Sequence, residues 1–172
     1  GFDKIKSVPL KLNSSLESKQ NKIIKIESFL VKNGFTEVIN FPFTENKEDK
    51  SITIDNPLDS NRGNLRTTLK DSLIENLLFN ERRQKDSIKL FEISDIYSNQ
   101  DNIFQEKKLG IIISGRQGHN HIEFAKKLDG KYLNEILNPD NDTSIFDIEE
   151  VSRETLKTKK RDKIFFTEIS IE

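Results

Sequence analysis

Two apolar runs near the middle of the chain constrain its fold more than any other feature. Residues 88–97 and residues 109–115 are rich in isoleucine, leucine and phenylalanine, and a short polar segment separates them. A short connection joins antiparallel strands, whereas parallel strands need a long crossover. The second run is too apolar for an exposed sheet edge, so the two runs are predicted to be neighbouring strands of a buried sheet.

Segments with helical periodicity surround these two runs. Residues 14–33 repeat leucine and isoleucine at near-helical spacing and end at Gly34, and residues 67–83 carry two parallel apolar rows. A helix is also expected over residues 123–137, and a final strand over residues 164–171. Long helices combined with antiparallel neighbours predict an α+β fold. A doubly wound nucleotide-binding fold would need a glycine-rich turn that this chain lacks.

A segment interrupted by a proline follows the first helix. Residues 37–43 alternate and are rich in β-forming residues, but Pro42 has no main-chain N–H to donate. Pro42 is therefore expected at a sheet edge, a bulge or a strand end, where the sheet stops pairing and meets something else. A further short strand is expected over residues 51–54, with a turn at Asn56-Pro57.

The composition limits the classes of partner. The chain has 172 residues, with 28 Lys and Arg against 29 Asp and Glu, so its net charge is -1 and any binding to nucleic acid or membrane must be local. The absence of cysteine excludes disulfides and thiolate metal sites and fits a reducing cytoplasm. No apolar run approaches the ~20 residues of a membrane span, so we expect a soluble, cytoplasmic protein. Because methionine is absent even at position 1, we expect one domain cut from a longer polypeptide.

Few residues carry candidate chemistry, and none is predicted to be catalytic. His119 and His121 lie two residues apart without enough further ligands, so no metal site is predicted. Glu92 lies inside an apolar strand, where it either faces solvent by alternation, which we favour, or is buried with a partner. Arg66 and Arg82, near the two ends of the second helix, could bind phosphate or carboxylate, but surface ion pairs are the expected outcome.

Five short stretches, taken together, resemble one family. They are Asn33-Gly34-Phe35-Thr36-Glu37-Val38, Asp55-Asn56-Pro57-Leu58, Leu65-Arg66-Thr67-Thr68-Leu69, Asn80-Glu81-Arg82-Arg83 and Leu90-Phe91-Glu92-Ile93. In order and spacing they resemble the catalytic-like core of the bacterial phenylalanyl-tRNA synthetase β subunit. The resemblance covers residues 1–137 and the closing strand at 164–172, while residues 138–163 form a divergent, loop-rich segment. It implies that residues 1–172 form a single class II aminoacyl-tRNA synthetase-like domain, with an antiparallel sheet flanked by helices.

The resemblance also implies an interface and partners. In the family the first helix and the proline-containing strand build subunit contacts. The candidate subunit interface therefore comprises Pro42, Phe43, Asn56, Pro57, Arg66 and Arg82. The implied partner is the α subunit in an α₂β₂ assembly, and tRNA-Phe, ATP and magnesium are implied for the whole enzyme. No cofactor is implied for this fragment, since the family's acidic magnesium ligands would lie upstream of it.

The chain departs from an active class II domain at two places. An active domain would have an arginine directly after the strand that here ends at Tyr97, but the chain continues with Ser98-Asn99-Gln100. No glycine follows Gly130, so the glycine-rich third motif of the class is absent as well. We therefore expect a non-catalytic, subunit-interface role in support of tRNA charging by the α subunit. Two alternatives stay open: amino-acid activation or nucleotide hydrolysis by the domain itself, and a tRNA-binding module built on the lysine clusters at residues 107–108, 126–127 and 157–161.

Overall fold

The computed structural model describes residues 4, 6, 8–9, 14–99, 102–138, 146–156 and 158–171. Residues 1–5, where the family resemblance begins, lie outside these ranges except for Lys4, and residues 139–145 of the divergent segment lie outside them too. Among the described residues, no helix combines the length and the apolar character needed to cross a lipid bilayer.

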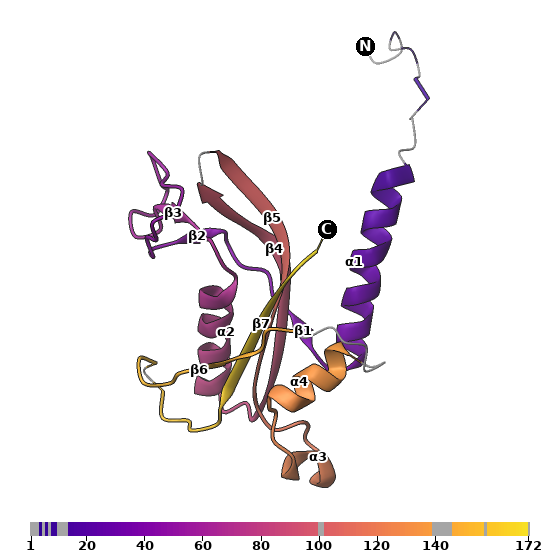
Figure 1. Ribbon diagram of the computed structural model, residues 1–172, viewed down its shortest axis with the longest axis vertical. Helices are drawn as coiled ribbons and strands as arrows, with labels where there is room; N and C mark the ends of the chain where they lie inside the picture. The colour runs from indigo at the N-terminus through magenta and orange to yellow at the C-terminus, as the bar shows by residue number, and fades with distance from the viewer. Residues whose placement is uncertain are drawn as a thin grey trace.

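A mixed sheet forms the centre of the domain (Figure 1). In spatial order, its described strands are β1 (Thr36–Glu37), β4 (Ser87–Asn99), β5 (Ile103–Gly115), β7 (Ile164–Ser170) and β6 (Glu149–Val151). The pair of β1 and β4 is parallel, and the other pairs are antiparallel. The predicted pairing of the two central runs is confirmed, because β4 and β5 pair along their whole length, with Leu90 opposite Ile112.

Helices cover both faces of this sheet. The helix α2 (Lys70–Arg82) lies on one face, and α1 (Ser14–Lys32) and α4 (Gly130–Leu137) lie on the other (Figure 1). Successive side chains of β5 point to alternate faces of the sheet. Ile112 packs against α2 on one face, and Ile111 packs in the hydrophobic core on the other face. This arrangement confirms the α+β prediction and explains why β5 is apolar along both of its faces.

The helix α2 lies especially close to β5. Its residues Leu73 and Leu77, and Leu69 just before it, are completely buried against the sheet. A Cβ atom added at Gly110 would lie only 2.8 Å from Leu73 Cδ1. The glycine therefore lets the helix approach the strand more closely than a larger residue would allow.

The prediction of one strand over residues 37–43 is wrong. The strand β1 ends at Glu37, and Phe43 belongs to β2 (Phe43–Thr44), which pairs with β3 (Asn64–Leu65) in a small separate sheet. The run is divided because the Asn40 side chain and the Pro42 carbonyl bind distant residues, as described below. Residues 51–54 likewise provide only an isolated bridge, between Thr53 and Asn64, instead of a strand.

The helix predicted over residues 123–137 is in fact two helices. The first, α3 (His121–Ala125), ends at Lys126, whose backbone is extended. The second begins after Asp129, whose side chain accepts a hydrogen bond from the main-chain nitrogen of Tyr132. Gly130 is therefore the first residue of α4, a position where a helix tolerates it better than in its interior.

The described part of the divergent segment is fastened to the domain. It contributes β6 at the edge of the sheet, so it is not formed by loops alone. Beyond β6, Arg153 Nη2 lies 2.7 Å from Oε1 of the buried residue Glu81 on α2, and Thr158 Oγ1 donates a 2.9 Å hydrogen bond to Glu81 Oε2. These contacts bind the segment to the C-terminal end of α2.

Candidate interaction surface

The segment between β1 and β2 carries an apolar row on its solvent side. Ile39, Phe41 and Phe43, which we call the outer row, are 91%, 74% and 41% exposed. The residues between them, Asn40 and Pro42, are partly buried. Alternation usually places apolar side chains toward the core and polar ones toward water. Here the order is reversed, because Asn40 faces inward while the three apolar side chains face out.

A buried ion pair holds the inner side of this segment. Arg66 Nη1 lies 2.9 Å from Glu92 Oε1, and the two side chains are 5% and 2% exposed. Asn40 donates two hydrogen bonds to the same carboxylate, from its main-chain nitrogen at 3.3 Å and from Nδ2 at 2.8 Å. A carboxylate can be buried at tolerable cost only when it is paired and hydrogen-bonded in this way.

These contacts correct two expectations from the sequence. Glu92 does not face solvent, since it is buried with a partner, and Arg66 is not part of a surface ion pair. Strand alternation failed for Glu92 because both faces of β4 are covered at this position. Its partners, Arg66 and Asn40, lie 26 and 52 residues away in sequence, so no local pattern identifies them.

Arg66 also joins the outer-row segment to the central sheet. Its main-chain nitrogen donates to the carbonyl of Pro42 at 2.9 Å, and its own carbonyl accepts from the main-chain nitrogen of Tyr97 at 2.9 Å. Its Nε donates to the carbonyl of Asp95 at 3.2 Å. Its Nη2 is buried and has no hydrogen-bond partner among the described residues. One arginine thus fixes the position of Pro42 and keeps one unused donor.

A polar hollow of about 250 Å³ lies beside the outer row. Phe41, Phe43 and Arg66 contribute to its wall, together with residues from the first turns of α2. Four carboxylates line it, and within the described part of the chain none of them is in an ion pair: Glu45, Glu48, Asp71 and Glu75. In the described residues, no group of three or more His, Cys, Asp or Glu side chains is placed to share a metal ion.

The structure brings only some of the predicted interface residues together. Pro42, Phe43 and Arg66 meet at the outer row and the hollow. Asn56 and Pro57 lie in the loop between β2 and β3, where Asn56 is exposed and Pro57 half-buried. Arg82 is exposed at the C-terminal end of α2, eleven residues beyond Asp71 and hence about 17 Å farther along the helix.

A half-buried lysine, missed in the sequence, lies on the opposite side of the sheet. Lys89 on β4 donates from Nζ to the carbonyl of Asn33 at 3.1 Å and to the Tyr132 hydroxyl at 3.4 Å. Burial lowers the pKa of Lys89, and burial with the nearby Glu123 charge raises the pKa of Tyr132. The amine joins the end of α1 and the helix α4 to the sheet, which is a structural role. In the sequence, the only indication that Lys89 is buried was its position inside an apolar strand.

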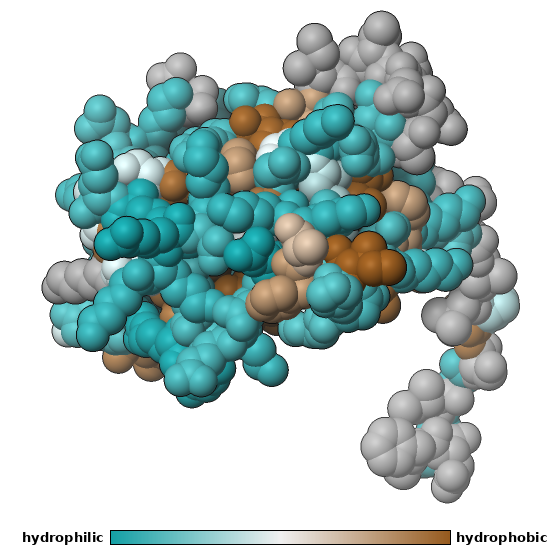
Figure 2. Space-filling model, turned by 90° about the horizontal axis from the view of Figure 1, so that it is seen from below, coloured by the Kyte–Doolittle hydropathy of each residue, from teal (hydrophilic) through white to brown (hydrophobic). Residues whose placement is uncertain are grey.

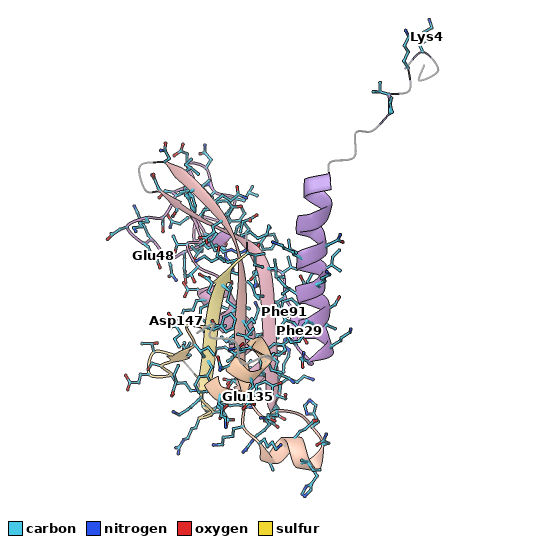
Figure 3. All side chains as sticks on the ribbon, turned by 45° about the vertical axis from the view of Figure 1, so that its right-hand side comes forward. Lys4, Phe29, Glu48, Phe91, Glu135 and Asp147 are labelled. Atoms are coloured by element: carbon cyan, nitrogen blue, oxygen red, sulfur yellow. The ribbon has the colours of Figure 1, made fainter. Side chains whose placement is uncertain are left out.

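Other apolar side chains are exposed along α1. Ile24, Phe29 and Val31 are 55%, 39% and 57% exposed. They flank the buried side of the helix, where Leu30 packs with Phe91, which Figure 3 labels on the strand beside α1. By contrast, hydrophilic side chains cover most of the face shown in Figure 2, where apolar side chains come to the surface only in small groups.

Comparisons with known proteins show which family of sequences the chain matches. Residues 7–139 match the family model described as the phenylalanyl tRNA synthetase beta chain CLM domain. The chain is 36% identical over 135 residues to the phenylalanine–tRNA ligase beta subunit of Fusobacterium nucleatum, covering 70% of this chain and 17% of that protein. It is 34% identical over 118 residues to the chloroplastic beta subunit of Pyropia yezoensis, covering 67% of this chain and 16% of that protein.

Among solved structures, the chain is similar to a pyrrolysyl tRNA synthetase from Desulfitobacterium hafniense, with a TM-score of 0.48 and 13% identity. That match covers 86% of this chain and 66% of the other. The chain spans about a sixth of the length of the beta subunits named above, given the 16% and 17% covered. The matched family model covers residues 7–139, well over half of the sequence. The chain therefore belongs to the family of phenylalanyl-tRNA synthetase β chains.

Proposed function

We propose that this chain is a non-catalytic subunit-interface domain. It binds the phenylalanyl-tRNA synthetase α subunit within an α₂β₂ assembly and so supports the ATP-dependent charging of tRNA-Phe that the α subunit performs. The observation that carries the proposal is the outer row, because Ile39, Phe41 and Phe43 face solvent from a backbone that the buried pair of Arg66 and Glu92 holds in place. Family membership supports the choice of partner.

The energetics of the outer row favour association. Full burial of an isoleucine or phenylalanine side chain contributes about 1.5–3 kcal/mol. Ile39 and Phe41 are each more than 70% exposed, so most of this stabilisation is still available to a partner. If the partner also covers the exposed apolar side chains of α1, their burial adds to the free energy of association. An obligate interface of this kind would bury roughly 2,000 Å² or more.

The residues of the sheet do not fit a triphosphate. The face of β5 at Gly110 is filled by Leu69 and Leu73, and the opposite face is covered by α1 and α4. The position after Tyr97 holds Ser98, where an active domain would supply an arginine. Holding ATP and its magnesium ion requires preorganised positive charge, so we propose that nucleotide chemistry belongs to the partner.

The tRNA-binding alternative is less well supported. Several lysines of its clusters are engaged in ion pairs: Lys107 with Asp95, Lys108 with Glu168, and Lys160 with Asp86. Lysines neutralised in this way have less free charge to offer to phosphates. A direct test would be to measure whether neutralising Lys159 and Lys160 weakens binding of tRNA-Phe to the complex.

The interface proposal is tested by titrating the cognate α subunit with matched surface variants. Ile39→Ser changes the outer row, and Ile122→Ser changes an isoleucine on α3 that is 71% exposed. We expect Ile39→Ser to weaken binding by about tenfold, since burial of the side chain is lost. Ile122→Ser should bind as the unchanged chain does. Equal affinities for all three proteins would contradict the proposal.

A further inference from the structure

The hollow beside the outer row combines an unused donor with unpaired carboxylates. Arg66 is 96% buried, from its 4% exposure, and its Nη2 has no hydrogen-bond partner in the described residues. A buried N–H group without an acceptor costs about 1–3 kcal/mol, so a fold usually provides a partner for it. Since the described residues of this chain provide none, and Nη2 is shielded from solvent in the chain alone, an acceptor from outside the chain gains that hydrogen bond only when the lining of the hollow opens to admit it.

The charge of the hollow defines the rest of the occupant. Glu45, Glu48, Asp71 and Glu75 line it. Two basic residues, Arg62 and Arg66, are among the described residues of the lining. The charge of Arg66 is neutralised by Glu92, so only Arg62 offsets the negative charge of the four carboxylates. Hydrogen bonds occupy only part of this acidic surface, through Asn46 to Asp71 and Thr67 to Glu48, both at 2.6 Å. The hollow therefore favours a cation that also brings a hydrogen-bond acceptor.

The size and position of the hollow select a polypeptide. Cofactor pockets measure about 300–1,000 Å³, so a hollow of about 250 Å³ suits one side chain with its adjacent main chain better than a nucleotide. Phe41 and Phe43 belong both to the hollow and to the outer row, which makes the two surfaces continuous. A partner that covers the outer row would thus bring its own chain to the mouth of the hollow.

We infer that a lysine or arginine of the α subunit enters this hollow. Its side chain pairs with Asp71 and Glu75, and a main-chain carbonyl next to it accepts a hydrogen bond from Arg66 Nη2. This inference rests on the proposed function, because it concerns the partner that covers the outer row. The inference specifies the partner's surface, which must present a basic residue beside apolar ones. It also predicts that the affinity for the α subunit falls as the salt concentration rises.

Charge reversal tests the inference separately from the apolar interface. Glu75→Lys reverses an exposed charge on α2 at the hollow. Glu135→Lys reverses an exposed charge on α4, which Figure 3 labels well away from Glu48 at the hollow. We expect Glu75→Lys to weaken α-subunit binding about tenfold or more at low salt, with a smaller loss at high salt, and Glu135→Lys to have little effect.

A second measurement follows Arg66 without replacing it, because Arg66 variants can fail to fold. In the chain labelled with ¹⁵N-arginine, the Nη2 proton signals of Arg66 should shift when the α subunit binds. If Glu75→Lys and Glu135→Lys bind alike, or if the Arg66 signals do not change, the inference is wrong. A loss of binding in Ile39→Ser alone would then leave the proposed function standing, whereas unchanged binding in Ile39→Ser would contradict both.

Discussion

Glu168, on the last strand of the sheet, caps the helix α2 about a hundred residues earlier in the chain. Its Oε1 accepts a hydrogen bond from the main-chain nitrogen of Leu69 at 2.7 Å and another from Thr68 Oγ1 at 3.0 Å. The N-cap residue of α2 is Leu69, which has no side chain able to bond the first free N–H groups. A carboxylate from β7 thus binds the main-chain N–H of the N-cap residue, as the Glu of a capping box does from within its own helix, and places a negative charge at the helix N-terminus.

This relationship predicts a specific loss of stability. Glu168→Ala should lower the free energy of unfolding by about 1–2 kcal/mol, because it removes the bond to the N-cap N–H, a charge favourable to the helix N-terminus and the ion pair with Lys108. The matched control is Glu149→Ala, which removes a carboxylate paired with Lys70 at the surface and should cost less than about 1 kcal/mol. Urea unfolding of the three proteins gives the comparison, and equal losses would exclude the capping role.

The buried pair beneath the outer row should be far more costly to break. Glu92→Leu leaves the charge of Arg66 buried without a partner, and Arg66→Met does the same to Glu92, so each should destabilise by about 3–5 kcal/mol. The double variant should recover much of that loss, because it removes both charges together. A double-mutant cycle in urea measures the coupling. Additive losses would show that the two residues act independently.

The contact between α2 and β5 predicts that Gly110 cannot be enlarged. Gly110→Ala places a Cβ 2.8 Å from Leu73 Cδ1 and 3.0 Å from Leu69 Cβ, so we expect overpacking to cost about 1–3 kcal/mol. Gly63→Ala is the control, since the nearest atom there would be 3.8 Å away. Thermal unfolding should show a lower Tm for Gly110→Ala alone. A Tm equal to that of the control would mean that the helix shifts without cost.

The lowered pKa of Lys89 predicts how the free energy of unfolding changes at alkaline pH. Burial lowers its pKa in the folded state, so above that pKa the unfolded chain binds more protons than the folded one. The free energy of unfolding therefore rises with pH until the unfolded pKa of about 10.4 is reached. The difference in stability between the unchanged chain and Lys89→Met should increase, in favour of the unchanged chain, as the pH rises from neutral toward the unfolded pKa.

The raised pKa of Tyr132 acts in the opposite direction above about pH 10, because the unfolded chain then loses its tyrosine proton first. Tyr132 is present in both proteins of the comparison, so most of its contribution cancels in the difference. Urea unfolding at several pH values provides the measurement. A difference that stays constant or decreases with pH would contradict the assigned effect of burial on Lys89.

Periodicity in the sequence predicted the elements that rely on local patterns. The central strands, the helix α2 and the last strand β7 all lie where their apolar spacing placed them, because each buries a regular face. The resemblance carried by five short motifs also predicted the family correctly. These features depend on residues that are neighbours in the sequence.

The remaining features depend on contacts between distant residues. The run at 37–43 reads as one strand, but Asn40 binds Glu92 and Pro42 binds Arg66, so the backbone leaves the sheet. The direction of the outer row follows from those same contacts and not from its alternation. Pro42 was the one local signal, since a residue that cannot donate marks the place where pairing stops.

The assembly state of the chain with its cognate α subunit decides whether the outer row is a subunit interface. Analytical ultracentrifugation of the two, alone and mixed, measures it without any variant. We expect the two to sediment as one stable complex, in which the outer row becomes protected from hydrogen exchange. The chain alone should perform no ATP–pyrophosphate exchange. A chain that sediments independently of the α subunit at micromolar concentration, or that exchanges pyrophosphate into ATP by itself, would contradict the proposed function.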